Sequence, residues 1–293
     1  MNKIKGYDIN ISIIMFLFVL FCLAPILLMV ISSVTDNNAL VRDGYGFLPS
    51  KMSIDAYEYL YKRGSTIFQA YGMSLVVSGV GTVVSMVLTT MLAYAISRKN
   101  LPGGGFLAFF VLFTFLFNGG LVPTYLLYAN TLHIKNTIFA QIVPNLLVRA
   151  FHVLLMRNYF LVNIPNDVLD AASIDGASEF QIFRNVVLPM SKPIIATVFL
   201  FQLIMYWNDW QNGLYYITTK TDLYTIQNLL NRMIQEIQYL ATASVQESVD
   251  LFSMPTITVR MAIAVIGLIP VVVIYPFIQK NFIKGIVLGA VKG

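Results

Sequence analysis

Residues 170–189 read DAASIDGASEFQIFRNVVLP, a polar stretch between two long apolar parts of the chain. A helix is predicted to lead into this stretch, because Asn166 can cap it and the acidic Asp167 and Asp170 suit the positive end of a helix dipole. Gly176 is the residue type best suited to a sharp break in the backbone. The stretch should therefore begin as a short helix that stops at a glycine turn.

A second helix is predicted after this turn. Ser178 and Gln181 have the spacing of a capping box, and the helix that they start is predicted to end near Pro189. Ala171 and Ala172 give the first helix a flat face that another surface can approach closely. We expect a helix, turn, helix arrangement, which a plain connector would not need.

The composition around this stretch places the chain in a membrane. Of its 293 residues, 57% are hydrophobic and 11% are charged, whereas soluble domains have about 25% charged residues. A spanning helix needs about 20 apolar residues. We predict an all-α integral membrane protein that forms a single transmembrane domain over residues 1–293, with outer loops at 34–67 and 219–257 and a polar loop at 164–190. The six predicted spans are residues 11–33, 68–97, 105–130, 136–158, 193–218 and 258–279.

The charges predict how these spans are oriented. The connections on the side of the N-terminus hold more Lys and Arg than those on the other side, so both termini are expected in the cytoplasm. The first apolar stretch is too long for a secretory signal and lacks an Ala-x-Ala cleavage site. The lone Cys22 excludes a disulfide within the chain. Nothing in the net charge of +5 indicates a nucleic-acid surface.

The polar stretch resembles the cytoplasmic EAA loop of bacterial ABC importer permeases. That pattern is Glu-Ala-Ala, a Gly four residues after the second Ala, nine residues, and then Ile-x-Leu-Pro. Here Gly176 lies four residues after Ala172, and residues 186–189 read VVLP. The chain departs from the pattern in Asp170 for Glu and Val186 for Ile, and both replacements keep the chemical character.

This resemblance implies a six-span type I importer permease whose first loop helix docks into an ATPase subunit as a coupling helix. The residues to which it assigns ATPase coupling are Asp170, Ala171, Ala172, Asp175, Gly176, Leu188 and Pro189. The chain itself needs no cofactor in this interpretation, because ATP and Mg are bound by the partner ATPase.

Three further segments are similar to carbohydrate-uptake permeases of the maltose-transporter type. They are the tail FIKGIVLGAVKG at 282–293, the motif WNDW at 207–210, and FLP at 47–49 followed by Ala56 and Tyr57. The overall sequence resembles permeases for complex oligosaccharides, such as pectin- or alginate-derived fragments. The implied partners are a second permease subunit in a heterodimer, two ATPase subunits and an extracytoplasmic sugar-binding protein that contacts the outer loop at 219–257. The implied location is the bacterial cytoplasmic membrane.

Catalytic patterns are missing from the sequence. The glycines at 103–105 are not followed by Gly-Lys-Ser/Thr, so they indicate a tight turn and not a phosphate loop. No metal-binding His/Cys spacing and no paired carboxylates are present. His133 and His152 are expected to pack or to lie at an interface. We therefore predict that the chain is no enzyme.

Polar and aromatic residues within the spans are candidates for a solute pathway, since amides and aromatic faces suit sugar hydroxyls and rings. These candidates are Asn118, Tyr125, Arg149, Gln202, Tyr206, Trp207 and Asn208. Two alternatives stay open. Trp207 and Trp210 can instead anchor the chain at the membrane interface. Arg149 can attract an anionic sugar, pair with Asp209 or face the interface.

The breaks in the spans have two interpretations as well. Asn118, Pro123 and Pro144 interrupt spans, which indicates either a pathway lining or simple kinks. Gly79 and Gly81 predict close approach between helices. The functional alternatives are a permease for a non-sugar solute and an ATP-independent carrier, with a membrane enzyme the weakest.

Overall fold

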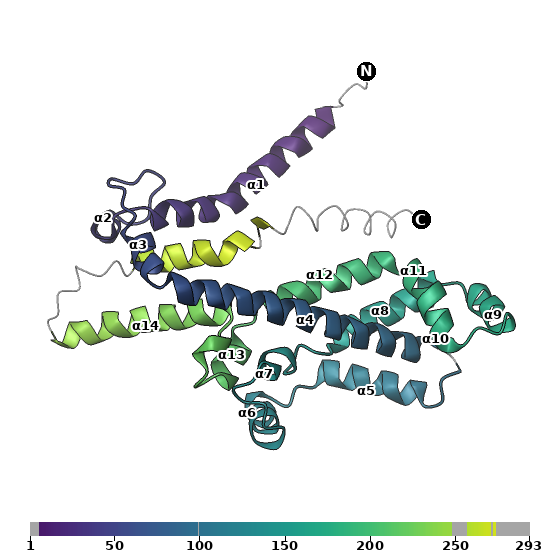
Figure 1. The fold of residues 1–293 in the computed structure, drawn as a ribbon. Helices are drawn as coiled ribbons and strands as arrows, with labels where there is room; N and C mark the ends of the chain where they lie inside the picture. The colour runs from purple at the N-terminus through teal and green to yellow at the C-terminus, as the bar shows by residue number, and fades with distance from the viewer. Residues whose placement is uncertain (1–5, 99, 248–256, 271, 274–293) are drawn as a thin grey trace. The chain divides into compact units, whose positions relative to one another are not determined.

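The computed structural model describes residues 6–98, 100–247, 257–270 and 272–273. In these ranges all regular elements are helical, and the β-structure is an isolated antiparallel bridge between Thr35 and Met52 (Figure 1). The chain forms two compact units, residues 1–67 with 230–273 and residues 68–229 with 274–293. The predicted tail at 282–293 and the end of the sixth predicted span lie outside the described residues.

The helices are labelled as in Figure 1. Their bounds are α1 Gly6–Ser33, α2 Asn37–Asp43, α3 Asp55–Lys62, α4 Gly64–Ser97, α5 Gly104–Leu116, α6 Leu121–Leu126, the π-helical turn η1 Leu127–Thr131, α7 Phe139–Ile142, α8 Ala150–Asn163, α9 Asn166–Ile174, α10 Glu179–Ile182, the π-helical turn η2 Phe183–Val187, α11 Leu188–Met190, α12 Lys192–Asn208, α13 Gln211–Tyr216, the 3-10 turn η3 Thr221–Leu223 and α14 Ile226–Glu247. A further apolar helix covers Ile257–Pro270.

Two helices are long and apolar enough to cross a membrane. They are the Ile11–Ser33 part of α1, with a mean hydropathy of 3.1, and α4, with a mean hydropathy of 2.0. Two pairs of helices pass the same test together, but they are bent by 117° (104–116 with 121–131) and by 84° (179–190 with 192–208). The described residues thus hold two to four spans by length and composition, and the count of six stays a prediction.

The first outer loop contains more helix than the sequence indicated. Turn signals at 43–44 and 49–50 and an amphipathic run at 53–61 predict a short extended piece followed by a surface helix. The surface helix is present as α3, but α2 occupies part of the region predicted to be extended. Asp36 caps α2, because its Oδ1 accepts from the backbone N–H groups of Asn38 and Ala39 at 3.1 Å. Lys51 Nζ donates to the other carboxylate oxygen of Asp36 at 3.0 Å. A capping aspartate is a signal that the sequence contained.

The amphipathic run at 224–240 predicts a helix in the second outer loop, and this helix is present as α14. It is joined to α3 within the first unit. Arg63, at the end of α3, donates from Nη1 and Nη2 to the two carboxylate oxygens of Glu236 at 2.9 and 3.2 Å. The Arg63 hydrogen bonds hold the pKa of Glu236 below its usual range. This fork-shaped pair joins the two outer-loop helices.

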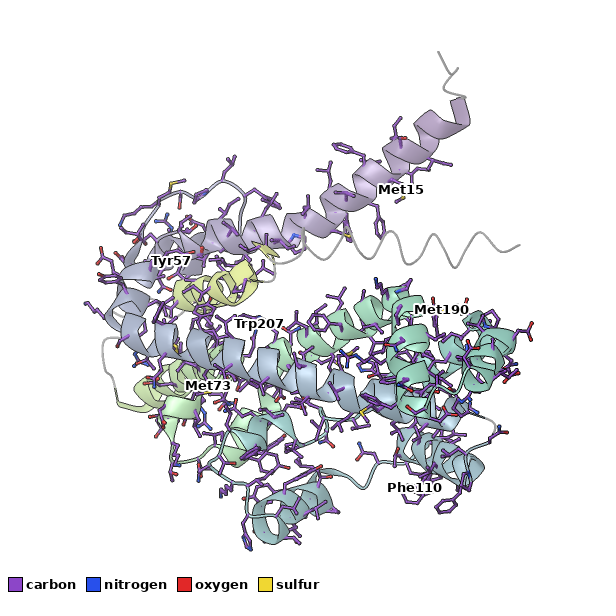
Figure 2. All side chains as sticks on the ribbon, turned by 45° about the vertical axis from the view of Figure 1, so that its right-hand side comes forward. Met15, Tyr57, Met73, Phe110, Met190 and Trp207 are labelled. Carbon is purple, nitrogen blue, oxygen red and sulfur yellow. The ribbon has the colours of Figure 1, made fainter. Side chains whose placement is uncertain are left out.

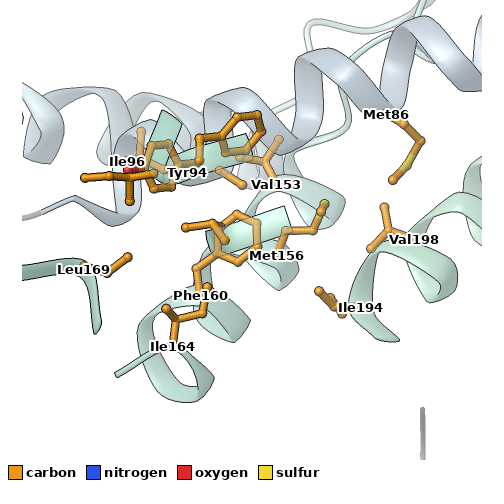
Figure 3. Packing of buried hydrophobic residues seen from close by; sticks show 14 residues of the cluster. Met86, Tyr94, Ile96, Val153, Met156, Phe160, Ile164, Leu169, Ile194 and Val198 are labelled. Atoms are coloured by element: carbon orange, nitrogen blue, oxygen red, sulfur yellow. The ribbon is translucent and has the colours of Figure 1, made fainter. Parts of the chain in front are cut away.

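The second unit has its core where α4 ends beside α8 and the polar loop. Figure 3 shows Tyr94 and Ile96 of α4 facing Met156 and Phe160 of α8, and these side chains are buried. Ala172 of α9 and Leu188 of α11 pack against the same cluster. The loop at 164–190 is therefore anchored in the hydrophobic core of its unit by its apolar side chains.

A break in the fourth predicted span is closed by side chains from neighbouring helices. The backbone between α7 and α8 is irregular, which frees carbonyl groups that a helix would satisfy. The Tyr206 hydroxyl donates to the carbonyl of Ile142 at 2.9 Å, and Gln202 Nε2 donates to the carbonyl of Leu146 at 2.6 Å. Asn212 Nδ2 donates to the carbonyl of Pro144 at 3.0 Å. Broken backbone at membrane depth is tolerated when protein groups replace the lost bonds in this way.

Gly81 lets α4 approach α12 closely, as the small residues predicted, whereas Gly79 has no neighbour within 4 Å of where a Cβ would lie. A Cβ on Gly81 would lie 2.6 Å from Tyr206 Cε1. We expect Gly81→Ala to displace the Tyr206 ring and to destabilise the protein by about 1–3 kcal/mol. Thermal unfolding in detergent measures this. Gly79→Ala is the matched control and should be neutral or slightly stabilising, because alanine is the better helix former. Equal destabilisation by both changes would contradict the packing argument.

Candidate functional site

The turn in the polar loop is a Schellman motif centred on Gly176. The N–H of Ala177 donates to the carbonyl of Ala172 at 3.0 Å, and the N–H of Gly176 donates to the carbonyl of Ser173 at 3.1 Å. Gly176 has φ +81°, in the left-handed region that disfavours side chains. Ala172 and Ala177 both pack against the core, which is the apolar contact typical of this motif. The predicted glycine turn is confirmed.

The helix before this turn starts differently from the prediction. Asn166 is already the first residue of α9, and the capping position belongs to Pro165 without a side-chain bond. The expected Asn166 cap is therefore wrong, since Pro165 takes the extended backbone conformation that a capping residue adopts. Asp167 does lie in the first turn, as expected.

The second helix of the loop begins with the predicted capping box. The Ser178 side chain accepts from the Gln181 N–H, and Gln181 Oε1 accepts from the Ser178 N–H at 2.8 Å. The helix continues through a π-helical turn to Met190, one residue beyond Pro189 (Figure 2). It then bends by 84° into α12. Pro189 is exposed, and Leu188 contacts the core.

The loop presents one face to solvent. Asp170, Ala171 and Asp175 are exposed, and the apolar side chains of Ile174 and Phe180 are 86% and 61% exposed. Exposed large apolar side chains beside acidic ones are typical of a docking surface. The core contacts lie on the opposite face of the loop, and they hold α9 and α10 against the rest of the unit.

Glu179 ties the second loop helix to the end of α4. Its carboxylate accepts from the Tyr94 hydroxyl at 2.5 Å and from Arg98 Nη2 at 2.9 Å. The Tyr94 ring also packs on Phe183 with 5.1 Å between ring centres, and the Arg98 guanidinium lies over the Tyr94 ring. The Tyr94 and Arg98 hydrogen bonds lower the pKa of Glu179. We call Tyr94, Arg98 and Glu179 the Glu179 cluster.

A cavity of ≈ 430 Å³ lies beside this cluster. Tyr94, Arg98 and Asn100 line it from the end of α4 and the following turn, and Asn166 and Asp170 line it from α9. Burial lowers the pKa of Arg98, but the hydrogen bond to Glu179 and the nearby charges, Asp170 among them, raise it above its usual value overall. The first loop helix thus faces α4 across a polar space, whereas the second helix is bonded to it directly.

A second cavity, of ≈ 340 Å³, lies where α8, α12 and α13 meet the broken segment. Arg149 lines it together with Asn208, so the structure brings two of the predicted pathway residues together. The remaining lining residues are Pro144, Asn145, Leu146, Ile204, Met205, Asp209, Trp210, Gln211 and Asn212. We call this the Arg149 cavity. Its polar lining consists of carboxamides, one indole, the Arg149 guanidinium and the Asp209 carboxylate.

Three other predicted pathway residues are buried inside the unit. Gln202 and Tyr206 give their polar groups to the broken segment, and Gln202 Oε1 accepts from His152 Nδ1 at 2.8 Å. Because the Gln202 amide nitrogen is bonded to a carbonyl, its oxygen must accept, and His152 carries its proton on Nδ1. Trp207 is 6% exposed and lies beside α4, with its ring centre 6.4 Å from that of Tyr71 (Figure 2). Solute contact stays a prediction for all three candidates.

The last two candidates lie apart from the Arg149 cavity lining. Asn118 is exposed between α5 and α6, and its Oδ1 accepts from the N–H of Gly120 at 2.8 Å. Tyr125 stacks on Tyr216 with 5.6 Å between ring centres and accepts from Lys135 Nζ at 3.2 Å. The first residue shapes a turn and the second packs on α13.

Sequence reasoning missed the Glu179 cluster and Asn212. The sequence shows a negative charge at that helix start, because Glu179 follows the capping Ser178. The hydrogen-bond partners of Glu179, however, are 81 and 85 residues away. Asn212 follows the WNDW motif closely, yet its bond to the Pro144 carbonyl depends on a chain break that the sequence only partly indicated.

Comparison with known proteins gives consistent matches. The family described as binding-protein-dependent transport system inner membrane component matches residues 105–287. The polygalacturonan/rhamnogalacturonan transport system permease protein YtcP of Bacillus subtilis (strain 168) is 35% identical over 99% of this chain and 100% of that protein. The arabinooligosaccharides transport system permease protein AraQ of the same strain is 26% identical over 98% of this chain and 96% of that protein.

A solved structure has the same fold. It is a chain of a bacterial ABC transporter involved in the import of the acidic polysaccharide alginate, with a TM-score of 0.75 and 26% sequence identity. The alignment covers 96% of this chain and 98% of that chain.

Proposed function

Because this chain belongs to the family of binding-protein-dependent transport system inner membrane components, we propose that it is one permease subunit of an ABC importer for sugars or oligosaccharides. The observation that carries the proposal is the glycine-centred loop of α9 and α10, which has a fixed turn, an anchored rear face and an exposed apolar front face. Full-length similarity to oligosaccharide permeases supports the choice of solute.

In this proposal the loop receives the motion of an ATPase subunit. Asp170, Ala171 and Ala172 belong to the docking helix, and Gly176 fixes its angle to α10. Leu188 and the core contacts then carry the movement into the helices behind. A nucleotide shifts a conformational equilibrium only through unequal affinity for its two states. The contact between the loop and the ATPase transmits the effect of this difference in affinity to the present subunit.

The proposed assembly follows from the family. It contains a second permease subunit, two ATPase subunits that bind ATP and Mg, and an extracytoplasmic binding protein that contacts the outer loop at 219–257. The excess of Lys and Arg on the side of the N-terminus supports cytoplasmic termini. The residues that line the Arg149 cavity, Asn208 among them, are the proposed solute contacts of this subunit.

The test is uptake of labelled oligosaccharide by proteoliposomes that contain this chain, its partner permease, the ATPase and the binding protein. We expect uptake that requires both ATP and the binding protein. Uptake without ATP would reject the importer in favour of a carrier. ATP-driven uptake of a non-sugar solute, with no uptake of any oligosaccharide, would reject the proposed solute class.

A further inference from the structure

A third cavity, beside the start of α5, is lined by two arginines. Its volume is ≈ 200 Å³, and its lining residues are Ile96, Ser97, Arg98, Leu101, Gly104, Gly105, Arg157 and Leu161. We call it the Arg157 cavity. It shares Arg98 with the cavity beside the Glu179 cluster, but Asp170 is not among its lining residues, and neither is any other Asp or Glu. The cavity therefore offers positive charge without a carboxylate of its own.

Arg157 supplies a charge that no carboxylate pairs with in the described part of the chain. The ion pairs there include Arg98 with Glu179 but none with Arg157. Arg157 Nε donates to the carbonyl of Ile96 at 3.1 Å, which holds the guanidinium beside the last turn of α4. Its two Nη groups have no acceptor among the described residues, and a guanidinium carries its donors in a fork that matches an anion. Arg98 is balanced by Glu179, so Arg157 leaves the cavity with one positive charge in excess.

The backbone at the start of α5 adds to this positive potential. α5 has 13 residues, and its capping residue Gly103 makes no side-chain bond. The first N–H groups of a helix lack intrahelical partners, and they attract anions together with the partial positive charge of the helix start. A Cβ built on Gly105 would meet no atom within 4 Å, so the space in front of this helix start is open. An anion in the cavity would thus meet the guanidinium groups and the helix start together.

The cavity lies at the level expected for lipid headgroups. α4 is apolar, has 34 residues and ends at Ser97. A helix of this length rises about 50 Å, more than the ~30 Å of hydrocarbon in a bilayer, so its end is expected near the boundary with water. The turn after α4 leads back into α5 (Figure 1), where the side chains of Phe106, Phe109 and Phe110 are 68%, 60% and 54% exposed. The charged cavity therefore borders an apolar surface that suits acyl chains.

The size of the cavity indicates which part of a ligand it can hold. Sites that enclose a whole small molecule have about 300–1,000 Å³, and the Arg157 cavity is smaller. It has room for a phosphate group, while the rest of the ligand lies outside. A phospholipid meets both conditions, because its phosphate is small and its acyl chains stay in the hydrocarbon.

We propose that the Arg157 cavity binds the phosphate of an anionic phospholipid, whose acyl chains lie along the exposed aromatic face of α5. Arginine binds phosphate in a two-point contact, and basic pockets between membrane helices are typical sites for anionic headgroups. The lipid touches Arg98, which also bonds Glu179, so it adjoins the link between α10 and α4. This inference goes beyond the proposed function, and only the assignment of the lipid to the cytoplasmic leaflet rests on it.

The test is photolabelling of the purified protein, with the subunits that co-purify with it, by phosphatidylglycerol that carries a photoreactive group on one acyl chain. Mass spectrometry of peptides measures the labelling within α5 and α8. We expect unmodified phosphatidylglycerol to compete for this labelling, and phosphatidylcholine and glycerol 3-phosphate at the same concentration to have little effect. Phosphatidylcholine tests the charge, because its headgroup is neutral overall, and glycerol 3-phosphate tests the need for acyl chains.

Arg157→Gln removes the unpaired charge and leaves the bond between Arg98 and Glu179 in place. We expect it to lower the labelling by about fivefold or more, the effect of one arginine near an anionic lipid. Arg184→Gln removes an exposed arginine of the same unit that does not line the cavity. It is the matched control and should be labelled as wild type.

A second variant leaves both arginines unchanged. Gly105→Glu places a carboxylate in the open space at the start of α5, where an acidic residue suits the helix dipole and does not weaken folding. We expect it to lower the labelling as Arg157→Gln does, because the carboxylate repels the phosphate and pairs with the guanidinium. Gly105→Gln has nearly the same size without the charge, and it should be labelled close to wild type.

Several outcomes would overturn the proposal. Unchanged labelling in Gly105→Glu, or in an assembled Arg157→Gln, would show that the cavity does not hold the headgroup, and so would an equal loss in Gly105→Gln. Equal competition by phosphatidylcholine would exclude recognition of the charge. Equal competition by glycerol 3-phosphate would make this a site for free phosphates and not for a lipid. Because labelling needs no transport, charge-dependent labelling together with uptake that needs no ATP would reject the proposed function and leave this inference standing.

Discussion

Replacing Gly176 by proline should abolish ATP-driven uptake while the complex still assembles. Gly176 has φ +81°, whereas a proline ring fixes φ near −65°. Proline would also remove the N–H that donates to the carbonyl of Ser173. The Schellman turn cannot form with this residue, so α9 loses its angle to α10. Uptake and binding-protein-stimulated ATP hydrolysis are the measurements, and both should fall to background.

A graded series separates backbone strain from steric effects at this position. No atom lies within 4 Å of a Cβ built on Gly176, so alanine meets no clash and adds only the cost of left-handed backbone. That cost is about 1–2 kcal/mol, enough to reduce the population of the correct turn by roughly 5–30-fold. Asparagine tolerates this conformation better and should retain more activity than alanine. Gly72→Ala in α4, also without a close neighbour, is the control. Equal activity of Gly176→Pro and wild type would contradict the role of the turn.

The local features of the loop could be predicted because their causes lie within a few residues. The glycine turn at Gly176 and the capping box of Ser178 and Gln181 each depend on contacts at most five residues apart. The surface helices α3 and α14 could be predicted for the same reason. The prediction that Asn166 caps α9 was wrong although its causes are also local, since two adjacent residues compete for the capping position and Pro165 takes it.

The long-range contacts of the site could not be predicted from the sequence. Residue types at 202 and 206 suggested a polar pathway, but both side chains complete the hydrogen bonds of a broken segment more than 50 residues away. Which carbonyl groups need a partner depends on where the backbone breaks, and only the folded chain determines this. Arg149 shows the opposite case. Its type and predicted depth indicated a functional role, and the structure adds the cavity that it lines.

Glu179→Ala should uncouple ATP hydrolysis from uptake, because it removes the hydrogen bonds that tie α10 to the end of α4. The expected result is a several-fold lower amount of oligosaccharide imported per ATP hydrolysed, with the complex still assembled. Tyr94→Phe removes the shorter of the two bonds and keeps the ring on Phe183, so it should give a smaller change of the same kind. Coupled residues are expected to be non-additive by about 0.5–3 kcal/mol. The double variant should therefore resemble Glu179→Ala alone.

The acid dependence of this link gives an independent test. The hydrogen bonds from Tyr94 and Arg98 lower the pKa of Glu179 in the folded protein. A carboxylate with a lowered folded pKa contributes stability above its unfolded pKa, about 4.3, and loses it as the pH falls through the folded value. Coupling in wild type should therefore stay constant from neutral pH down to that range and weaken only below it.

Glu179→Gln removes the titrating group and keeps a carbonyl oxygen for the Tyr94 hydroxyl. We expect an intermediate ratio of solute to ATP with no acid-dependent step of its own. Glu58→Gln, an exposed change on α3, is the control and should behave as wild type at every pH. If Glu179→Ala and Tyr94→Phe reduce the ratio additively, or if neither reduces it, α10 does not act on α4 through this cluster. The apolar contacts of Phe183 and Leu188 would then be the connection between the loop and the helices behind it.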